Sequence, residues 1–135
     1  MSSFKHPEEL PCYQIAREFR IMIARLCRNL PREEEYRLKD QMLRASRSVT
    51  ANIAEGFGRH HNQENIQFSR QARGSLVEMR DHLNVSVDEE FFEEQDIAAC
   101  RKLLDEAHKS LNGYIAYLAS RSKEQAQQST MRNQQ

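Results

Sequence analysis

The feature that most constrains this chain is the regular recurrence of apolar residues at steps of three and four, which places them on one face of an α-helix. Four such stripes follow one another and the last ends at Leu118. The 135 residues include only four glycines and three prolines, too few for a turn-rich domain. Val, Ile and Thr are also scarce, which disfavours several strands. We predict an all-α fold, an up-down-up-down antiparallel four-helix bundle.

The first two helices have recognisable start and stop signals. We expect the first to begin near Pro11, because proline suits a first helical turn, and to stop at Pro31. The second should open with the three glutamates at 33–35, whose carboxylates face the positive end of the helix dipole, and carry Tyr36 in its apolar stripe. The glycines at 56 and 58 should end it in the left-handed conformation.

The second half of the chain predicts two more helices and a polar tail. Asn62 is expected to cap the third helix, which should fray near Val87. The acidic segment 88–96 reads as a solvated loop that leads into the fourth helix. From about residue 121 the sequence is too polar to offset the entropy of ordering. The predicted organisation is an N-terminal arm (1–10), a bundle (11–120) and a disordered tail (121–135).

Polar residues form a second line beside the apolar stripe on the second and third helices. Their spacing puts the members of each line on one helix face, and the members are Arg44, Ser48, Asn52 and Glu55, then Arg70, Ser75 and Glu78. If the two lines meet, we expect a buried hydrogen-bonded network that fixes helix register. The alternatives are a ligand or metal pocket at Glu55 and Glu78, and plain exposure of these side chains on the surface. Gly74 and Gly113 lie inside predicted helices, where we expect close helix contacts. A ligand or another subunit that approaches the backbone would favour glycine in the same way.

No catalytic motif stands out, so we predict no enzyme activity, no metal and no cofactor. Cys12, Cys27 and Cys100 lie on or beside apolar stripes, where cysteine behaves as a small hydrophobe. Asp105 with His108 supplies one of the two carboxylate–histidine pairs that a di-iron bundle needs. An odd cysteine count without CxxC spacing or a signal peptide favours the cytoplasm. No apolar run is long enough to cross a bilayer.

The charge distribution carries more information than its sum, which is zero. Between residues 37 and 80 the basic side chains outnumber the acidic ones eight to four, and the basic ones are Arg37, Lys39, Arg44, Arg47, Arg59, Arg70, Arg73 and Arg80. These residues are candidate phosphate contacts for RNA or DNA. Ordinary solvated helix faces, with some arginines used internally, are the competing explanation.

Several stretches together resemble one bacterial family. They are Phe4-Lys5 followed by EELP at 8–11, the segment RASRSVTANIAEGFGR at 44–59, and ARGSLVE at 72–78. Over about residues 4 to 118 the chain resembles the four-helix bundle family of the 23S rRNA-intervening-sequence proteins. The family's motif positions, carried over one by one, fall on Ser48, Asn52, Glu55, Gly56, Gly74, Ser75 and Glu78.

The resemblance implies a bundle that assembles as a ring, typically a homopentamer, without established enzymatic activity. We therefore predict a self-assembling interaction scaffold. The alternative, a nucleic-acid-binding accessory protein, follows from related bundles that work with a reverse transcriptase in diversity-generating retroelements. Thr50 stands where the family often has proline, and Arg47 replaces a small or apolar residue. The zero net charge also departs from the strongly basic accessory bundles.

Overall fold

The computed structural model describes residues 4–134, and within this range all regular structure is helical. Two 3-10 helices, η1 and η2, accompany four α-helices in the order η1 (Pro7–Glu9), α1 (Pro11–Cys27), η2 (Arg32–Glu34), α2 (Leu38–Phe57), α3 (Asn62–Asp88) and α4 (Glu94–Asn133). The predicted all-α class and the four helices are confirmed. None of the helices in the described range combines the length and the apolar character that a bilayer crossing requires.

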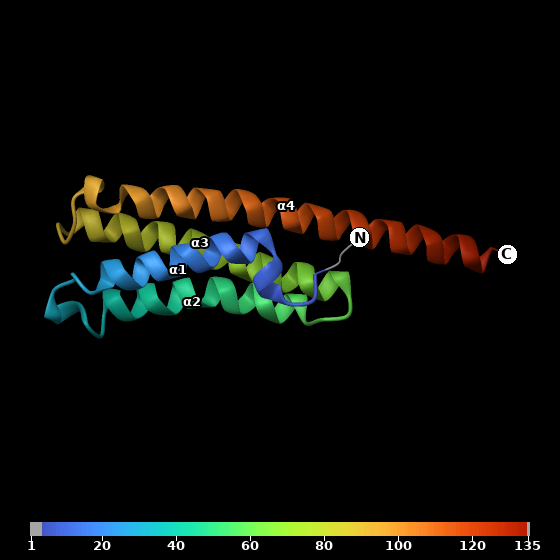
Figure 1. Cartoon of the computed structure of the whole chain (residues 1–135), viewed down its shortest axis with the longest axis horizontal. Coiled ribbons are helices and arrows are strands. Elements are labelled where there is room, and N and C mark those ends of the chain that lie inside the picture. The colour runs from blue at the N-terminus through green and yellow to red at the C-terminus, as the bar shows by residue number, and fades with distance from the viewer. Residues whose placement is uncertain (1–3, 135) are drawn as a thin grey trace.

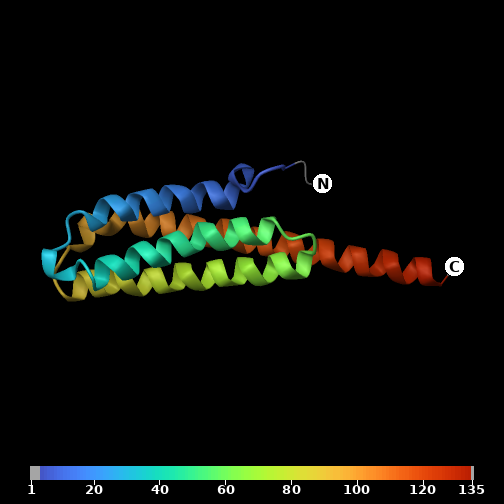
Figure 2. The same cartoon turned by 90° about the horizontal axis from the view of Figure 1, so that it is seen from below.

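The four helices lie side by side, and the chain reverses direction at each link (Figure 1). Each helix packs on two others, through the pairs α1–α2, α2–α3, α3–α4 and α1–α4. Within residues 4–134 the backbones of the diagonal pairs, α1 with α3 and α2 with α4, stay apart, while buried side chains of all four helices share one core. The view from below shows the same four-sided arrangement, with the end of α4 projecting past the other helices (Figure 2). The core therefore runs along the axis that all four helices surround.

The core is built from the apolar stripes that the sequence predicts. Its largest fully buried side chains include Phe19, Ile23, Met42, Val49, Ile53, Leu76, Met79, Leu83, Ile97, Leu104 and Leu111. Each such side chain contributes about 1.5–3 kcal/mol of transfer free energy, before the entropy cost of ordering it is subtracted. Tyr36 is the exception to the predicted stripes, since 91% of it is exposed.

The predicted start of the second helix is wrong by several residues. The acidic run forms η2 and a turn, and α2 begins only at Leu38. The carboxylate of Glu34 accepts a hydrogen bond from the Leu38 amide (3.3 Å), so it satisfies a free N–H of the first turn from outside the helix. Tyr36 lies in the intervening turn, which explains its exposure. The first helix begins at Pro11, as predicted, but ends at Cys27, short of Pro31.

The predicted left-handed glycines at the end of the second helix are also wrong. No described glycine has a positive φ, and Gly58 has a right-handed φ of −74°. Gly56 is buried inside α2, where a Cβ would lie 2.6 Å from Asn65 Oδ1 and 2.9 Å from Phe68 Cβ. Close approach of α3 therefore explains this glycine. The N-cap of α3 is His61, so the predicted cap at Asn62 is wrong by one position.

The acidic segment forms the expected link and helix start. α3 ends at Asp88, and Glu90 adopts the left-handed conformation with a φ of 65°. The carboxylate of Asp96 accepts a hydrogen bond from the Glu93 amide (2.8 Å), which closes a capping box at the start of α4. Acidic side chains are favourable there because the N-terminus of a helix carries partial positive charge.

The end of α4 differs from the predicted disordered tail. The helix continues to Asn133, because Gln, Ala, Lys, Glu and Arg are good helix formers and no glycine or proline follows Gly113. Hydrogen bonds from Asn62 to Gln125 (3.1 Å) and from Gln63 to Ser122 (2.7 Å) tie the first part of this extension to α3. Residues 1–3 of the expected arm and residue 135 of the expected tail lie outside the described residues.

Candidate functional site

Three motif residues meet on the seam between α2 and α3. Ser75 donates a hydrogen bond from its hydroxyl to Ser48 Oγ (2.9 Å). Asn52 Nδ2 donates to Ser48 Oγ (3.0 Å) and to the Ser48 carbonyl (2.9 Å). All three side chains are half-buried. The contact fixes the register of α2 against α3, because sliding either helix by one residue would break the bond between the two serines.

The charged members of the two polar lines do not join this contact. Glu55 forms an ion pair with Arg59 (2.8 Å), and Glu78 accepts a bond from buried His82 (2.8 Å). Arg44 and Arg70 are exposed and make no ion pair within the described residues. The predicted buried network of all seven residues is therefore wrong. Only its small neutral members turn inward, since burying an unpaired charge is costly.

The structure separates Glu55 from Glu78 and so removes the predicted pocket between them. The Ser48–Ser75 bond sets an antiparallel register, in which Glu55 and Glu78 lie in opposite directions from that bond, about 15 Å apart along the axis. Asp105, considered with His108 for a di-iron site, instead pairs with Arg80 (2.6 Å). Within residues 4–134 no three Asp, Glu, His or Cys side chains gather as metal ligands.

The two exposed glycines do not make the close helix contacts expected of them inside the chain. A Cβ built on Gly74 or on Gly113 meets no atom of the described chain within 4 Å, apart from its chain neighbours and the adjoining backbone of its own helix. Close contact inside the bundle therefore does not explain either residue. Arg73, beside Gly74, donates to the side chain of Asn112, beside Gly113 (2.9 Å). Both glycines thus lie at the same level of the bundle, on its outer surface.

Half of the basic side chains proposed as phosphate contacts have partners within the chain. Lys39 pairs with Glu35 (2.9 Å), while Arg59 and Arg80 pair with the carboxylates named above. Arg73 is bound to Asn112. The remaining four are exposed and form no ion pair among residues 4–134, and they are Arg37, Arg44, Arg47 and Arg70. These four arginines are therefore the best candidates for contacts with phosphate.

The three cysteines are free and buried. Loss of solvation raises the pKa of the Cys12 thiol to about 12 and that of Cys27 to about 11, because burial disfavours the thiolate. The pKa of Cys100 is raised for the same reason. Since the thiolate is the nucleophile, these residues are unreactive structural groups, as their place on the apolar stripes predicts.

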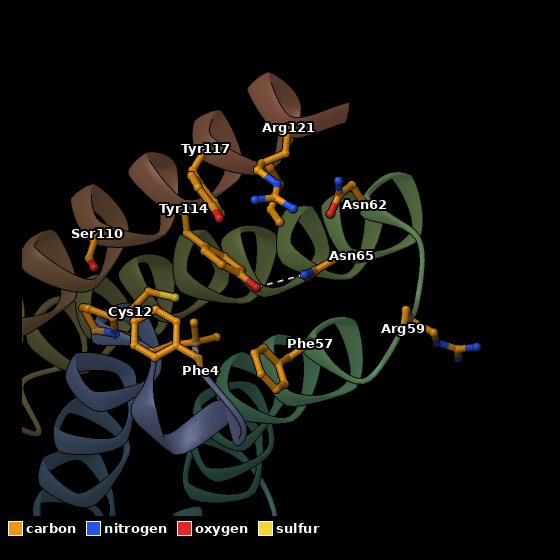
Figure 3. A pocket seen from close by; sticks show the side chains of 13 residues that line it. Phe4, Cys12, Phe57, Arg59, Asn62, Asn65, Ser110, Tyr114, Tyr117 and Arg121 are labelled. Carbon is orange, nitrogen blue, oxygen red and sulfur yellow. Dashed lines mark hydrogen bonds between the residues drawn. The ribbon is translucent and has the colours of Figure 1, made fainter. Parts of the chain in front are cut away.

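A pocket of about 470 Å³ opens where the α2–α3 link and the start of α1 meet α4. Figure 3 shows side chains from these segments around it, and its lining comprises Phe4, Leu10, Pro11, Cys12, Phe57, Arg59, Asn62, Asn65, Ser110, Tyr114, Tyr117, Leu118 and Arg121. Sequence reasoning missed this site because its residues are far apart in the chain. The available signal was the pair Tyr114 and Tyr117, which puts two phenol groups at the end of the last apolar stripe.

Comparisons with known proteins agree with this architecture. The family model described as 23S rRNA-intervening sequence protein matches residues 8–113. Among solved structures, the chain is similar to a protein of unknown function from the S23 ribosomal protein family of Bacteroides thetaiotaomicron. The TM-score is 0.72 at 22% identity, covering 78% of this chain and 95% of that one, a likeness that shows the fold alone. A search among curated proteins finds no match.

Proposed function

This chain belongs to the 23S rRNA-intervening sequence protein family, and from that premise we propose that it is a non-enzymatic bundle that assembles with copies of itself as an interaction scaffold. The main support for this proposal is the presence of a glycine at position 74, inside α3 and on the surface of the bundle. Glycine inside a helix costs about 1 kcal/mol relative to alanine, and no atom of the described chain approaches this one. A neighbouring subunit packed closely against α3 would explain why this position has no side chain.

The surroundings of Gly74 support the same proposal. Val77 follows it by one helical turn and is 52% exposed, so an apolar side chain adjoins the notch that the glycine leaves. Gly113 offers a second notch at the same level on α4. Small residues allow two helix backbones to approach closely, and an adjacent apolar residue is then buried. The buried free thiols are compatible with a cytoplasmic setting.

Light scattering after size-exclusion chromatography tests the assembly directly. We expect a multiple of the 15.9 kDa chain mass, five in a pentameric ring. Gly74→Leu should lower that mass, because the leucine fills the notch while the open surroundings leave the monomer fold intact. Ala98→Leu, at an exposed position of α4, is the matched control. A strict monomer at micromolar concentration would refute the proposal.

We also consider a second function, in which the protein binds nucleic acid as an accessory to a reverse transcriptase. The four unpaired arginines on α2, on α3 and in the turn before α2 favour it. If all four contact phosphates of duplex nucleic acid, affinity should fall roughly a hundredfold between about 50 and 200 mM salt. The double variant Arg44→Gln/Arg47→Gln should flatten this dependence, whereas Arg80→Gln, at a position already paired with Asp105, should not. An affinity for nucleic acid that does not change between these salt concentrations would exclude this function.

A further inference from the structure

The pocket at the end of the bundle has the size and the walls of a small-molecule site. Its volume, about 470 Å³, lies within the range of roughly 300–1,000 Å³ typical of ligand pockets. Phe57, Tyr114 and Tyr117 contribute aromatic rings from α2 and α4, while Leu10 and Leu118 are apolar and buried. Cys12 adds a thiol whose raised pKa keeps it neutral. Such walls favour a flat, apolar ring system.

A polar pair lies in this otherwise apolar wall. Asn65, itself buried, donates from Nδ2 to the Tyr114 hydroxyl oxygen (2.8 Å), as the dashed line in Figure 3 marks. The Tyr114 oxygen therefore acts as an acceptor, and its own proton is free to donate to a ligand. Burial raises the pKa of Tyr114, so the phenol keeps this proton at neutral pH.

Arg121 provides a cation at the mouth. Its guanidinium lies 5.9 Å from the centre of the Tyr117 ring, and no carboxylate within residues 4–134 forms an ion pair with it. Figure 3 shows the Arg121 side chain extending from α4 toward the space between Tyr117 and Asn62. The other arginine of the lining, Arg59, points away and is already paired with Glu55. The mouth thus complements negative charge.

We propose that this pocket binds a small planar aromatic molecule that carries one acidic group. The ring lies among Phe57, Tyr114 and Tyr117, and the acidic group lies at the mouth, where Arg121 compensates its charge. The Tyr114 hydroxyl donates to a polar atom of the ring system or of the acidic group. This binding site is independent of self-assembly and of any contact with nucleic acid.

Calorimetric titration with 2-naphthoate and with its neutral analogue 2-naphthamide tests the charge complementarity. The full-length protein should bind naphthoate roughly fivefold more tightly than naphthamide, the effect of one half-exposed ionic contact. Arg121→Gln should bring the two affinities together by weakening naphthoate alone. Arg132→Gln removes an exposed cation from the same helix outside the pocket and should preserve the fivefold preference.

A second variant tests the location. Ser110 is half-buried in the lining, and Ser110→Phe should fill the space and abolish binding of both probes while the helical circular dichroism is retained. Equal affinities for the two probes in the unmodified protein, or undiminished binding to a folded Ser110→Phe variant, would overturn the proposal.

Discussion

Replacing Gly56 by alanine should destabilise the bundle, although alanine is the better helix former. The new methyl carbon would lie 2.9 Å from Phe68 Cβ and 3.1 Å from the Asn65 carbonyl oxygen. Both atoms are fixed to the backbone of α3, so that helix must shift, and overpacking of this kind costs about 1–3 kcal/mol. The methyl would also displace Asn65 Oδ1, only 2.6 Å away, and disturb the bond from Asn65 to Tyr114, which is worth about 1 kcal/mol.

The higher helix propensity of alanine offsets about 1 kcal/mol of this cost. The free energy of unfolding should therefore fall by about 1–3 kcal/mol. Urea denaturation followed by circular dichroism measures it as a lowered midpoint with an unchanged slope. Gly113→Ala is the matched control, because its Cβ meets nothing within 4 Å and it should stabilise the bundle by about 0.5–1 kcal/mol. A Gly56→Ala variant as stable as the parent would refute the inferred closeness of α2 and α3.

Three further changes have defined outcomes. Thr50 Oγ1 accepts a bond from Arg20 Nη1 across α1 and α2 (2.8 Å), so Thr50→Val should cost about 1–2 kcal/mol in urea denaturation. Asp105→Asn should cost less than about 1 kcal/mol, and less still in high salt, because the pair with Arg80 is exposed. The Cys12 thiol has a folded pKa of about 12, raised from 9.0. Above about pH 9 the unfolded chain therefore releases this proton first, and stability should fall with rising pH more steeply in the parent than in Cys12→Ala, as thermal unfolding would measure.

The helical fold was predictable because it depends on a repeating local signal. The spacing of Phe19, Ile23, Leu76 and Leu83 identifies buried helix faces whatever partner each face later meets. Helix ends depend instead on single contacts. The sequence does not show whether Glu34 acts as the first residue of a helix or as an acceptor ahead of it, since both places favour a carboxylate.

The candidate sites were less predictable because they depend on which faces meet. The spacing correctly paired Ser48, Asn52 and Ser75, which lie close to the apolar stripes and are drawn in with them. It placed Glu55 and Glu78 in the same network, although both side chains are exposed and pair instead with Arg59 and His82. The pocket at the end of the bundle is lined by the α2–α3 link, the N-terminal arm and α4, which are far apart in the sequence. No local pattern predicts that these segments meet.

Gly56 and Gly74, which the resemblance places among the family's motif positions, have different physical roles, and this difference is testable. Gly56 has its reason within one chain, since α3 occupies the space that its side chain would fill. Gly74 has no such reason, because the surroundings of its backbone leave room for a side chain. Substitution at 56 should therefore change the free energy of unfolding and leave the mass of the folded assembly unaltered. Gly74→Leu should change the mass and leave the monomer fold intact. If Gly74→Leu instead unfolds the chain, or Gly56→Ala dissociates a stable assembly, the assignment of one glycine to the fold and the other to the interface is wrong.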